Sequence, residues 1–259
     1  MADDDGFRVE RDPASGIARI TLDVPGKLNR ISMTARDQLA GAFSELGDAE
    51  DIRVIVLAGA GDKAFTAGGD IAAFMRASPE VLSHLAKNVG APERCPKPVV
   101  AALHGFTFGV GLELALACDL RIAADDTVLG LPEITLGMIP GSGGTQRLAH
   151  LIGLSRAKEV ILRGRRISAA DALAWGLVAE VVPLGQLESR ADAVAAELAA
   201  KAPLALRVAK RVLNQVYDAP LHVGMELEGL AYGFLRTTGD FAEGVAAFGD
   251  KRQPKFSGH

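Results

Sequence analysis

Cysteine is scarce in this chain: Cys95 and Cys118 are the only two among its 259 residues. They form neither a Cys-x-x-Cys pair nor the larger, even set of cysteines that is typical of a secreted disulfide framework. We therefore expect two reduced thiols, with Cys118 filling part of the core. This use of cysteine favours a cytoplasmic protein.

Long hydrophobic runs and an excess of basic residues are also missing. No apolar stretch approaches the roughly 20 residues that a membrane span requires, and the N-terminal MADDDGF is acidic where a targeting peptide would be basic. The formal net charge is −4 and the pI is about 5.8. A basic nucleic-acid-binding surface is therefore not expected, and the pair Lys210–Arg211 should be solvated. We expect neither nucleic acid nor membrane as a partner.

The usual residues of metal and serine-nucleophile sites lack the spacing that such sites need. The five histidines show no metal-ligand pattern. Ser142 lies in GSGG rather than in a G-x-S-x-G turn. The sequence thus predicts no metal site and no Ser-His-Asp triad.

What the chain does contain is an alternation of apolar strands and helices in its first part. Hydrophobic residues make up 49% and charged residues 23% of the sequence, enough for a substantial core. Alternation of this kind indicates an α/β fold with crossover connections. Strands are predicted at 17–22, 54–57, 99–103 and 120–123, and helices at 34–47 and 112–118.

Beyond about residue 143 the pattern becomes mainly helical. A short strand at 178–182 interrupts the helices. These helices carry more apolar surface than one compact core can bury, which favours contacts between subunits. Helices are predicted at 144–151, 155–162, 169–174, 187–201, 203–216, 220–235 and 239–249.

Two glycine-bearing turns could present main-chain N–H groups to a ligand. In TAGGD (66–70), Gly68 and Gly69 tolerate positive φ, and Asp70 can cap a helix from Ile71. In FGVGLE, Gly109 and Gly111 open a helix whose N-terminus attracts negative charge. A tight turn alone would also explain these glycines. If both turns point to one carbonyl oxygen, they form an oxyanion hole.

Two glutamates follow in similarly glycine-bearing sequence. Glu113 lies between Leu112 and Leu114, so partial burial and a raised pKa are expected; the alternative is a helix glutamate on a solvated face. Glu133 follows Pro132 at a helix start, where it could simply favour the helix dipole. Two converging carboxylates beside exposed N–H groups nevertheless favour acid–base chemistry on a polarised carbonyl.

In KAFTAGGDI (63–71), the 109–119 segment, the 132–148 segment and GRRISAADALAWGLV (164–178), the chain resembles the crotonase (enoyl-CoA hydratase/isomerase) superfamily. The likeness runs in order from about residue 8 to the terminal KRQPKF. It implies a spiral of repeated ββα units over 1–195 and a C-terminal helical region over 196–259. It also implies a homotrimer, or a hexamer built as a dimer of trimers.

The resemblance assigns roles to individual residues. The N–H groups of Gly69 and Val110 would form the oxyanion hole, and Glu113 and Glu133 would be the two catalytic acids. Tyr232 and Lys251 would approach the CoA, the lysine from a neighbouring subunit. The acyl-CoA site would be lined by Ala67, Gly68, Gly69, Asp70, Ile71 and Ala72, with Ile71 near the adenine.

Some positions depart from the family pattern. Position 69 is glycine where alanine is commoner, and position 110 is valine where glycine is common. His104 stands where many members have asparagine. Lys27 lies one place later than the usual CoA-contacting lysine. Val110 could narrow the acyl pocket, which concerns the substrate rather than the reaction.

The expected activity is hydration of a trans-2-enoyl-CoA to a 3-hydroxyacyl-CoA, with CoA as part of the substrate and no further cofactor. Alternatives are Δ3,Δ2-enoyl-CoA isomerisation, C–C cleavage and thioester hydrolysis within the family. A non-catalytic RNA-binding member is a further alternative, against which the acidic pI counts. Fatty-acid, amino-acid and aromatic degradation all remain open as pathways.

Overall fold

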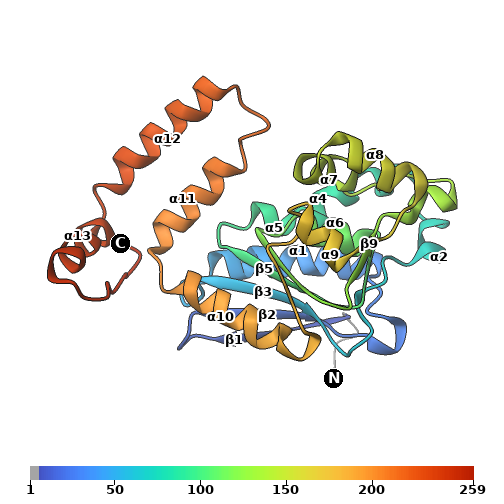
Figure 1. Ribbon diagram of the computed structural model, residues 1–259, viewed down its shortest axis with the longest axis horizontal. Coiled ribbons are helices and arrows are strands. Elements are labelled where there is room, and N and C mark those ends of the chain that lie inside the picture. Colours follow the sequence, from blue (N-terminus) through green and yellow to red (C-terminus); the bar gives the residue numbers. More distant parts are fainter. Residues whose placement is uncertain (1–5) are drawn as a thin grey trace.

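The computed structural model describes residues 6–259 and shows a mixed α/β body from which a helical arm projects (Figure 1). The body is built on two sheets. The larger has the strand order β1-β2-β3-β5-β7-β10, in which only the β1–β2 pair is antiparallel. Its strands are β1 (Phe7–Asp12), β2 (Ile17–Leu22), β3 (Val54–Gly59), β5 (Val99–Leu103), β7 (Leu120–Ala124) and β10 (Glu180–Val182).

A smaller sheet of order β4-β6-β8-β9 lies beside the first. In the sequence, each of β3, β5 and β7 is followed by a short strand of the smaller sheet and then by a helical segment. This recurrence confirms the expected ββα units. The strands of the smaller sheet are β4 (Ala64–Thr66), β6 (Phe106–Phe108), β8 (Val128–Gly130) and β9 (Ile167–Ser168).

Both faces of the larger sheet are covered, which explains why its strands are continuously apolar. In β3, Val54 and Val56 pack in one buried cluster with α10 (Leu187–Ala199). The alternate residues Ile55 and Leu57 pack in the other, with α1 (Met33–Asp48). The period of two along a strand thus divides the core into two layers.

The remaining helices of the body surround the smaller sheet and the ends of the larger one. Residues 79–94 include three short helices; the first begins at Pro79 and is capped by Ser78, whose hydroxyl accepts a hydrogen bond from the Val81 N–H. Helices of four or five residues are too short to show a periodic pattern. These helices are η1 (Pro25–Lys27), α2 (Ile71–Phe74), α3 (Pro79–Ser83), α4 (Leu85–Val89), α5 (Ala91–Arg94), α6 (Val110–Leu116), η2 (Pro132–Leu136), α7 (Gly144–Ile152), α8 (Leu154–Arg163), α9 (Ala169–Ala174) and η3 (Leu184–Gln186).

The arm consists of α11 (Pro203–Leu213), α12 (Leu221–Leu235) and α13 (Gly239–Asp250). Figure 1 shows α12 and α13 standing away from the sheets, and no residue of α12 is buried. The C-terminal segment returns to the body, where the Arg53 guanidinium donates a hydrogen bond to the Phe256 carbonyl (2.8 Å). The arm is therefore attached at both its ends.

Two expectations about polar and reactive side chains are decided by the fold. Cys95 and Cys118 are free and buried, and burial raises the pKa of the Cys118 thiol to about 12.

Lys210, expected to be solvated, is instead only 8% exposed. Its Nζ lies 2.7 Å from Asp119 Oδ2 and also donates to the Pro92 and Lys97 carbonyls. The prediction that Lys210 is solvated was wrong. It was based on the adjacent Arg211, and the local sequence does not reveal that Asp119, distant in the chain, pairs with Lys210.

Among residues 6–259, none of the helices combines the length and the apolar content needed to cross a membrane.

Candidate active site

A pocket of about 200 Å³ lies where α2, α6 and the loop before α7 meet. It gathers residues from both glycine turns and from both glutamate segments. Of the residues predicted from the sequence, it is lined by Ala67, Gly68, Gly69, Ile71, Val110, Glu113 and Glu133.

The first glycine turn is held by its own hydrogen bonds. The Thr66 hydroxyl accepts from the Gly68 N–H (3.1 Å), and the Asp70 carboxylate accepts from the Ala72 N–H (3.1 Å) to start α2. Gly68 has φ +113°, and a Cβ there would lie 3.3 Å from the Phe108 carbonyl oxygen, so glycine is required. In the described part of the chain, the Gly69 N–H has no backbone acceptor.

The second glycine turn lies directly beside the first. Gly109 has φ +56° and ψ −128°, a conformation that only glycine adopts readily. A Cβ added there would be 4.0 Å from the Gly68 Cα and 3.2 Å from Glu133 Oε1. Val110 follows as the first residue of α6, where a helix leaves the N–H without an intrahelical acceptor. Two adjacent N–H groups are thus available at one end of the pocket.

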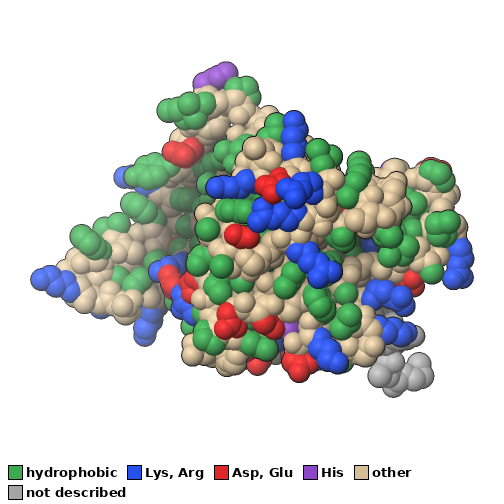
Figure 2. Space-filling view, turned by 45° about the vertical axis from the view of Figure 1, so that its right-hand side comes forward, with side chains coloured by type: hydrophobic (Ala, Val, Ile, Leu, Met, Phe, Trp, Pro, Cys, Tyr) green, Lys and Arg blue, Asp and Glu red, His purple; other side chains and the backbone are tan. Residues whose placement is uncertain are grey.

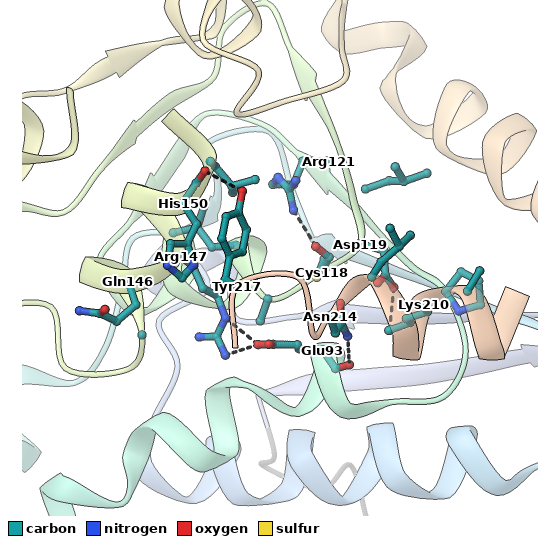
Figure 3. Close-up of a pocket in the computed structure, with 18 of the residues that line it drawn as sticks. Glu93, Cys118, Asp119, Arg121, Gln146, Arg147, His150, Lys210, Asn214 and Tyr217 are labelled. Atoms are coloured by element: carbon teal, nitrogen blue, oxygen red, sulfur yellow. Dashed lines mark hydrogen bonds and ion pairs between the residues drawn. The ribbon is translucent and has the colours of Figure 1, made fainter. Parts of the chain in front are cut away.

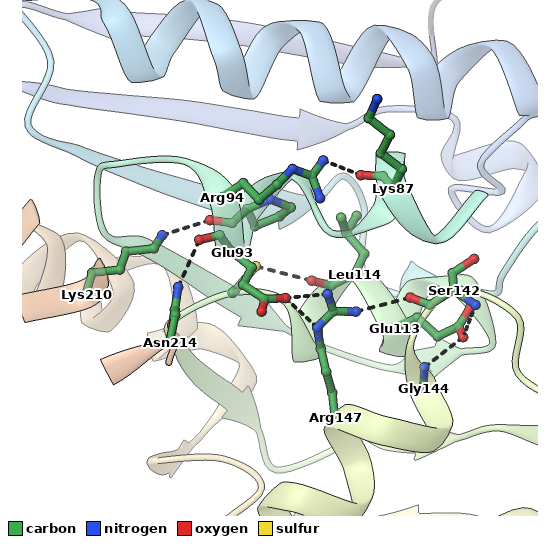
Figure 4. A network of polar contacts seen from close by, with 12 residues as sticks. Lys87, Glu93, Arg94, Glu113, Leu114, Ser142, Gly144, Arg147, Lys210 and Asn214 are labelled. Carbon is green, nitrogen blue, oxygen red and sulfur yellow. Dashed lines mark hydrogen bonds and ion pairs between the residues drawn. The ribbon is translucent and has the colours of Figure 1, made fainter. Parts of the chain in front are cut away.

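Glu113 lies in the first turn of α6 and is 2% exposed. Its Oε1 accepts hydrogen bonds from the N–H groups of Ser142 (2.7 Å) and Gly144 (3.0 Å), as Figure 4 shows. Burial raises the pKa of this carboxyl, while the two N–H groups and the Arg36 charge act in the opposite direction. The loop before α7 therefore fixes the orientation of one carboxylate oxygen.

That loop is itself tied to the rest of the molecule. Arg147 of α7 donates to the Ser142 carbonyl (3.2 Å) and, through Nε, to Glu93 of α5 (2.7 Å). The Glu93 carbonyl accepts from Asn214 at the end of α11 (3.0 Å). Figure 4 shows this network running from the arm to Glu113. The position of Glu113 thus depends on packing between elements distant in sequence.

Glu133 is the second residue of η2 and has a different environment. Burial, with a smaller contribution from the Glu113 charge, raises the pKa of Glu133 to about 7. Its Oε2 is buried and has no hydrogen-bond partner among the described residues. One carboxyl is therefore anchored by two N–H groups, while the other can hold a proton near neutral pH. Such a difference suits the two for opposite proton-transfer roles.

Arg36 is a pocket residue that the sequence prediction missed. It lines the pocket from α1 and is 3% exposed. Its spacing from Leu39 and Phe43 places all three on the buried face of that helix, and this was the available signal. Leu82 and Leu85, from the segment of short helices, also line the pocket.

Tyr232 and Lys251 are not brought to the pocket within one chain. Tyr232 lies on α12 with 73% of its surface exposed, and Lys251 ends α13. Figure 1 shows both helices at the opposite end of the molecule from α2. A role for either residue at this pocket would therefore need a second copy of the chain.

A larger cleft of about 670 Å³ lies between α7 and α11 (Figure 3). Two of its acidic side chains are paired locally, Asp119 with Lys210 and Glu93 with Arg147. Arg121 is likewise engaged, since it donates to the Cys118 carbonyl (2.6 Å). The smaller pocket, where two carboxyls converge beside the N–H groups of Gly69 and Val110, is the candidate active site.

Comparison with known proteins places this geometry in a family. The family model described as enoyl-CoA hydratase/isomerase matches residues 12–259. A crystal structure of enoyl-CoA hydratase from Bacillus anthracis is 39% identical, with a TM-score of 0.92 and coverage of 98% of this chain and 100% of that one. The mitochondrial enoyl-CoA hydratase domain-containing protein 2 of Bos taurus is 38% identical over 95% of this chain and 86% of its own.

A third relative, the (E)-benzylidenesuccinyl-CoA hydratase of Thauera aromatica, is 36% identical over 93% of this chain and 96% of its own. Fold and sequence together show a protein of the crotonase superfamily. Within it, the chain belongs to the enoyl-CoA hydratase/isomerase family.

Proposed function

We propose that the protein is an enoyl-CoA hydratase that adds water, in the syn sense, to a trans-2-enoyl-CoA and yields a 3-hydroxyacyl-CoA. The observation that carries this proposal is the convergence of Glu113 and Glu133 on one pocket, beside two main-chain N–H groups that have no acceptor within residues 6–259. Hydration needs one group to take a proton from water and another to supply one to carbon. The experiment that tests it is a mass measurement of the product formed from a trans-2-enoyl-CoA.

In this proposal, the N–H groups of Gly69 and Val110 bind the thioester oxygen. Drawing electron density onto that oxygen makes C3 electrophilic and stabilises the enolate-like state that follows. The position of Val110 at the start of α6 adds the favourable end of the helix dipole. Both donors belong to the main chain, so the valine side chain does not interfere with this role.

Glu113 is the proposed base. Its Oε1 is held by Ser142 and Gly144, and the carboxylate positions and deprotonates the water that attacks C3. Glu133 is the proposed acid and delivers a proton to C2. Its raised pKa supports this role, because a carboxyl with a pKa of about 7 retains a proton to donate. The two steps add H and OH with no change that requires a redox cofactor or a metal.

The relatives support the family more firmly than the particular reaction. Δ3,Δ2-Isomerisation needs only one base to move a proton between C2 and C4, so the presence of both glutamates favours hydration. C–C cleavage and thioester hydrolysis would use the same oxyanion hole. The acyl group is equally open, because relatives of similar identity carry the names enoyl-CoA hydratase and (E)-benzylidenesuccinyl-CoA hydratase.

Gly144 offers a test of how Glu113 is positioned. A Cβ on Gly144 would lie 3.0 Å from both Cγ and Oε1 of Glu113, so we expect Gly144→Ala to displace the carboxylate and lower kcat by about 10- to 100-fold. Gly41→Ala on α1 is the matched control, since among the described residues no atom lies within 4 Å of its added Cβ and Gly41 does not line the pocket. Steady-state hydration of crotonyl-CoA measures both. Equal rates in the two variants would contradict the proposed role of this loop.

We further propose that the arm joins copies of the chain into a homotrimer or a hexamer. Exposed apolar side chains cover the arm, as the space-filling view also shows, beside a hollow that separates the arm from the body (Figure 2). An apolar surface of this extent favours association. A neighbouring copy could then bring Tyr232 and Lys251 to the CoA. The exposed large hydrophobic residues of α12 are Leu221, Val223, Met225, Leu230, Tyr232 and Phe234.

Leu230→Glu tests this assembly. Placing a charge at a residue that is 68% exposed in the single chain should shift the oligomer toward smaller species if the side chain is buried between copies. Sedimentation velocity measures the shift, and Leu154→Glu on α8 controls for added surface charge at a leucine that is 62% exposed. A wild-type protein that sediments as a monomer would refute the assembly.

We also propose a cytoplasmic location for the protein, because its free thiols fit a reducing compartment.

A further inference from the structure

The pocket contains a buried cation that hydration as described does not use. Arg36 is 3% exposed, and its guanidinium remains charged at any physiological pH. Burial of a charge is costly unless a counter-charge or hydrogen bonds compensate for it. The buried Arg36 guanidinium therefore needs a counter-charge or hydrogen-bond acceptors.

Within residues 6–259, the Arg36 guanidinium makes no hydrogen bond and no ion pair, and its Nε is fully enclosed without a partner. Its contacts are electrostatic and aromatic. The Phe74 ring centroid lies 5.0 Å from Cζ, and Glu113 and Asp37 are the acids whose charges act on it. Glu113 already accepts two N–H groups at Oε1 and, in the proposed reaction, loses its charge when it takes a proton from water.

The chain makes room for this guanidinium at the thioester end of the pocket. A Cβ on Gly69 would lie 2.5 Å from Nη2 of Arg36 and 2.9 Å from the Phe74 ring. An alanine at position 69, the commoner residue in the family pattern, would displace one of these side chains. Glycine at this position and arginine at position 36 thus belong to one arrangement, which places a cation beside the proposed oxyanion hole.

We propose that Arg36 binds a second carboxylate on the acyl group, so that the preferred substrate is a 2-enoyl-CoA with a carboxylate one or two carbons beyond the reacting double bond. This inference rests on the proposed function and specifies its substrate class. A planar guanidinium pairs well with a carboxylate, and the site otherwise leaves those donors unused. Apolar walls from Phe74, Leu82 and Leu85 would exclude water from the pair.

The short distance between Arg36 and Gly69 limits where the carboxylate can lie. The oxygen bound by the Gly69 N–H is attached to C1, so a cation that lies where a Gly69 Cβ would be is near the reacting carbons and not at the end of a long chain. Glutaconyl-CoA, with its carboxylate attached through one methylene to C3, matches this placement. Its uncharged isostere is 5-methylhex-2-enoyl-CoA.

The test compares kcat/KM of the wild-type protein for these two substrates. We expect glutaconyl-CoA to be preferred by about 100-fold, as is typical when a buried charge pair is completed. Arg36→Met should remove most of this preference by lowering the rate with glutaconyl-CoA alone, and Arg36→Lys should restore part of it. Arg163→Met, at an exposed arginine of α8, is the matched control and should keep the preference.

Binding provides a readout that does not depend on turnover or on the stability of a variant. The wild-type protein should bind glutaryl-CoA about 100-fold more tightly than 5-methylhexanoyl-CoA in calorimetry. Equal affinity or equal kcat/KM for the charged and uncharged members would overturn the inference and leave the hydratase proposal intact. A loss in Arg36→Met that is the same for both substrates would show that Arg36 only positions Glu113. If neither enoyl-CoA gains water, the proposed function itself fails.

Discussion

Glu113→Gln should lower kcat for the hydration of crotonyl-CoA by about 10²- to 10⁴-fold, the range lost when a general base is removed. The amide oxygen of glutamine can still accept hydrogen bonds from Ser142 and Gly144, so the loop before α7 should keep its place. What the substitution removes is the ability to take a proton from water. The substrate should still bind, and KM should change much less than kcat.

A matched control for this variant is Glu45→Gln on α1, where the glutamate side chain is 73% exposed and lies outside the pocket. It should hydrate crotonyl-CoA at the wild-type rate. Circular dichroism on both variants separates loss of chemistry from loss of fold. Full activity in a folded Glu113→Gln protein would mean that another group activates the water, and the assignment of Glu113 would be wrong.

Glu133→Gln should lower kcat by a similar factor of about 10²–10⁴, because the proton for C2 is then missing. Its effect on the pH profile should differ from that of Glu113→Gln. Wild-type kcat/KM should fall as the pH rises through about 7, where the Glu133 carboxyl loses its proton. In Glu133→Gln this fall on the alkaline side should disappear from the residual activity. A wild-type rate that rises through pH 7 would contradict the role of Glu133 as acid.

The same substitution, Glu133→Gln, should raise thermal stability at alkaline pH although it lowers activity. The pKa of Glu133 is raised from 4.5 to about 7 in the folded state, so the folded protein holds this proton more tightly than the unfolded chain. The resulting stabilisation is complete below pH 4.5 and is lost as the pH rises through about 7. Glu133→Gln should therefore melt at a higher temperature than the wild type at pH 8, where the wild type buries the charged form.

The elements with strong local signals could be predicted from the sequence. The 17–22 strand was predicted at its observed limits, and the 34–47 helix to within one residue at each end, because apolar periodicity marked both. The smaller sheet was not predicted strand by strand. Its strands have two or three residues, which is too short for any period, and their pairing is set by contacts between distant segments.

In the candidate site, too, the residues with a local sequence signal were predicted, and those placed by contacts between distant segments were not. Both glutamates and both glycine turns were visible because special residues occupy short motifs, and the pocket brings them together. Arg36 was missed because a charged residue in an amphipathic helix is ordinarily solvated. Its spacing from Leu39 and Phe43 did indicate the buried face of α1. That spacing gives no sign that this face meets the glycine turn at 66–70. The same applies to Lys210, whose partner Asp119 is 91 residues away.

The central claim is that this pocket adds water to the double bond of a trans-2-enoyl-CoA. Its most direct test is the mass and the ultraviolet absorbance of the product formed by the purified protein from crotonyl-CoA and glutaconyl-CoA. The account predicts a saturated acyl chain heavier by one water molecule and a loss of the enoyl absorbance. A product of unchanged mass with a shifted double bond, or free CoA released without hydration, would contradict it.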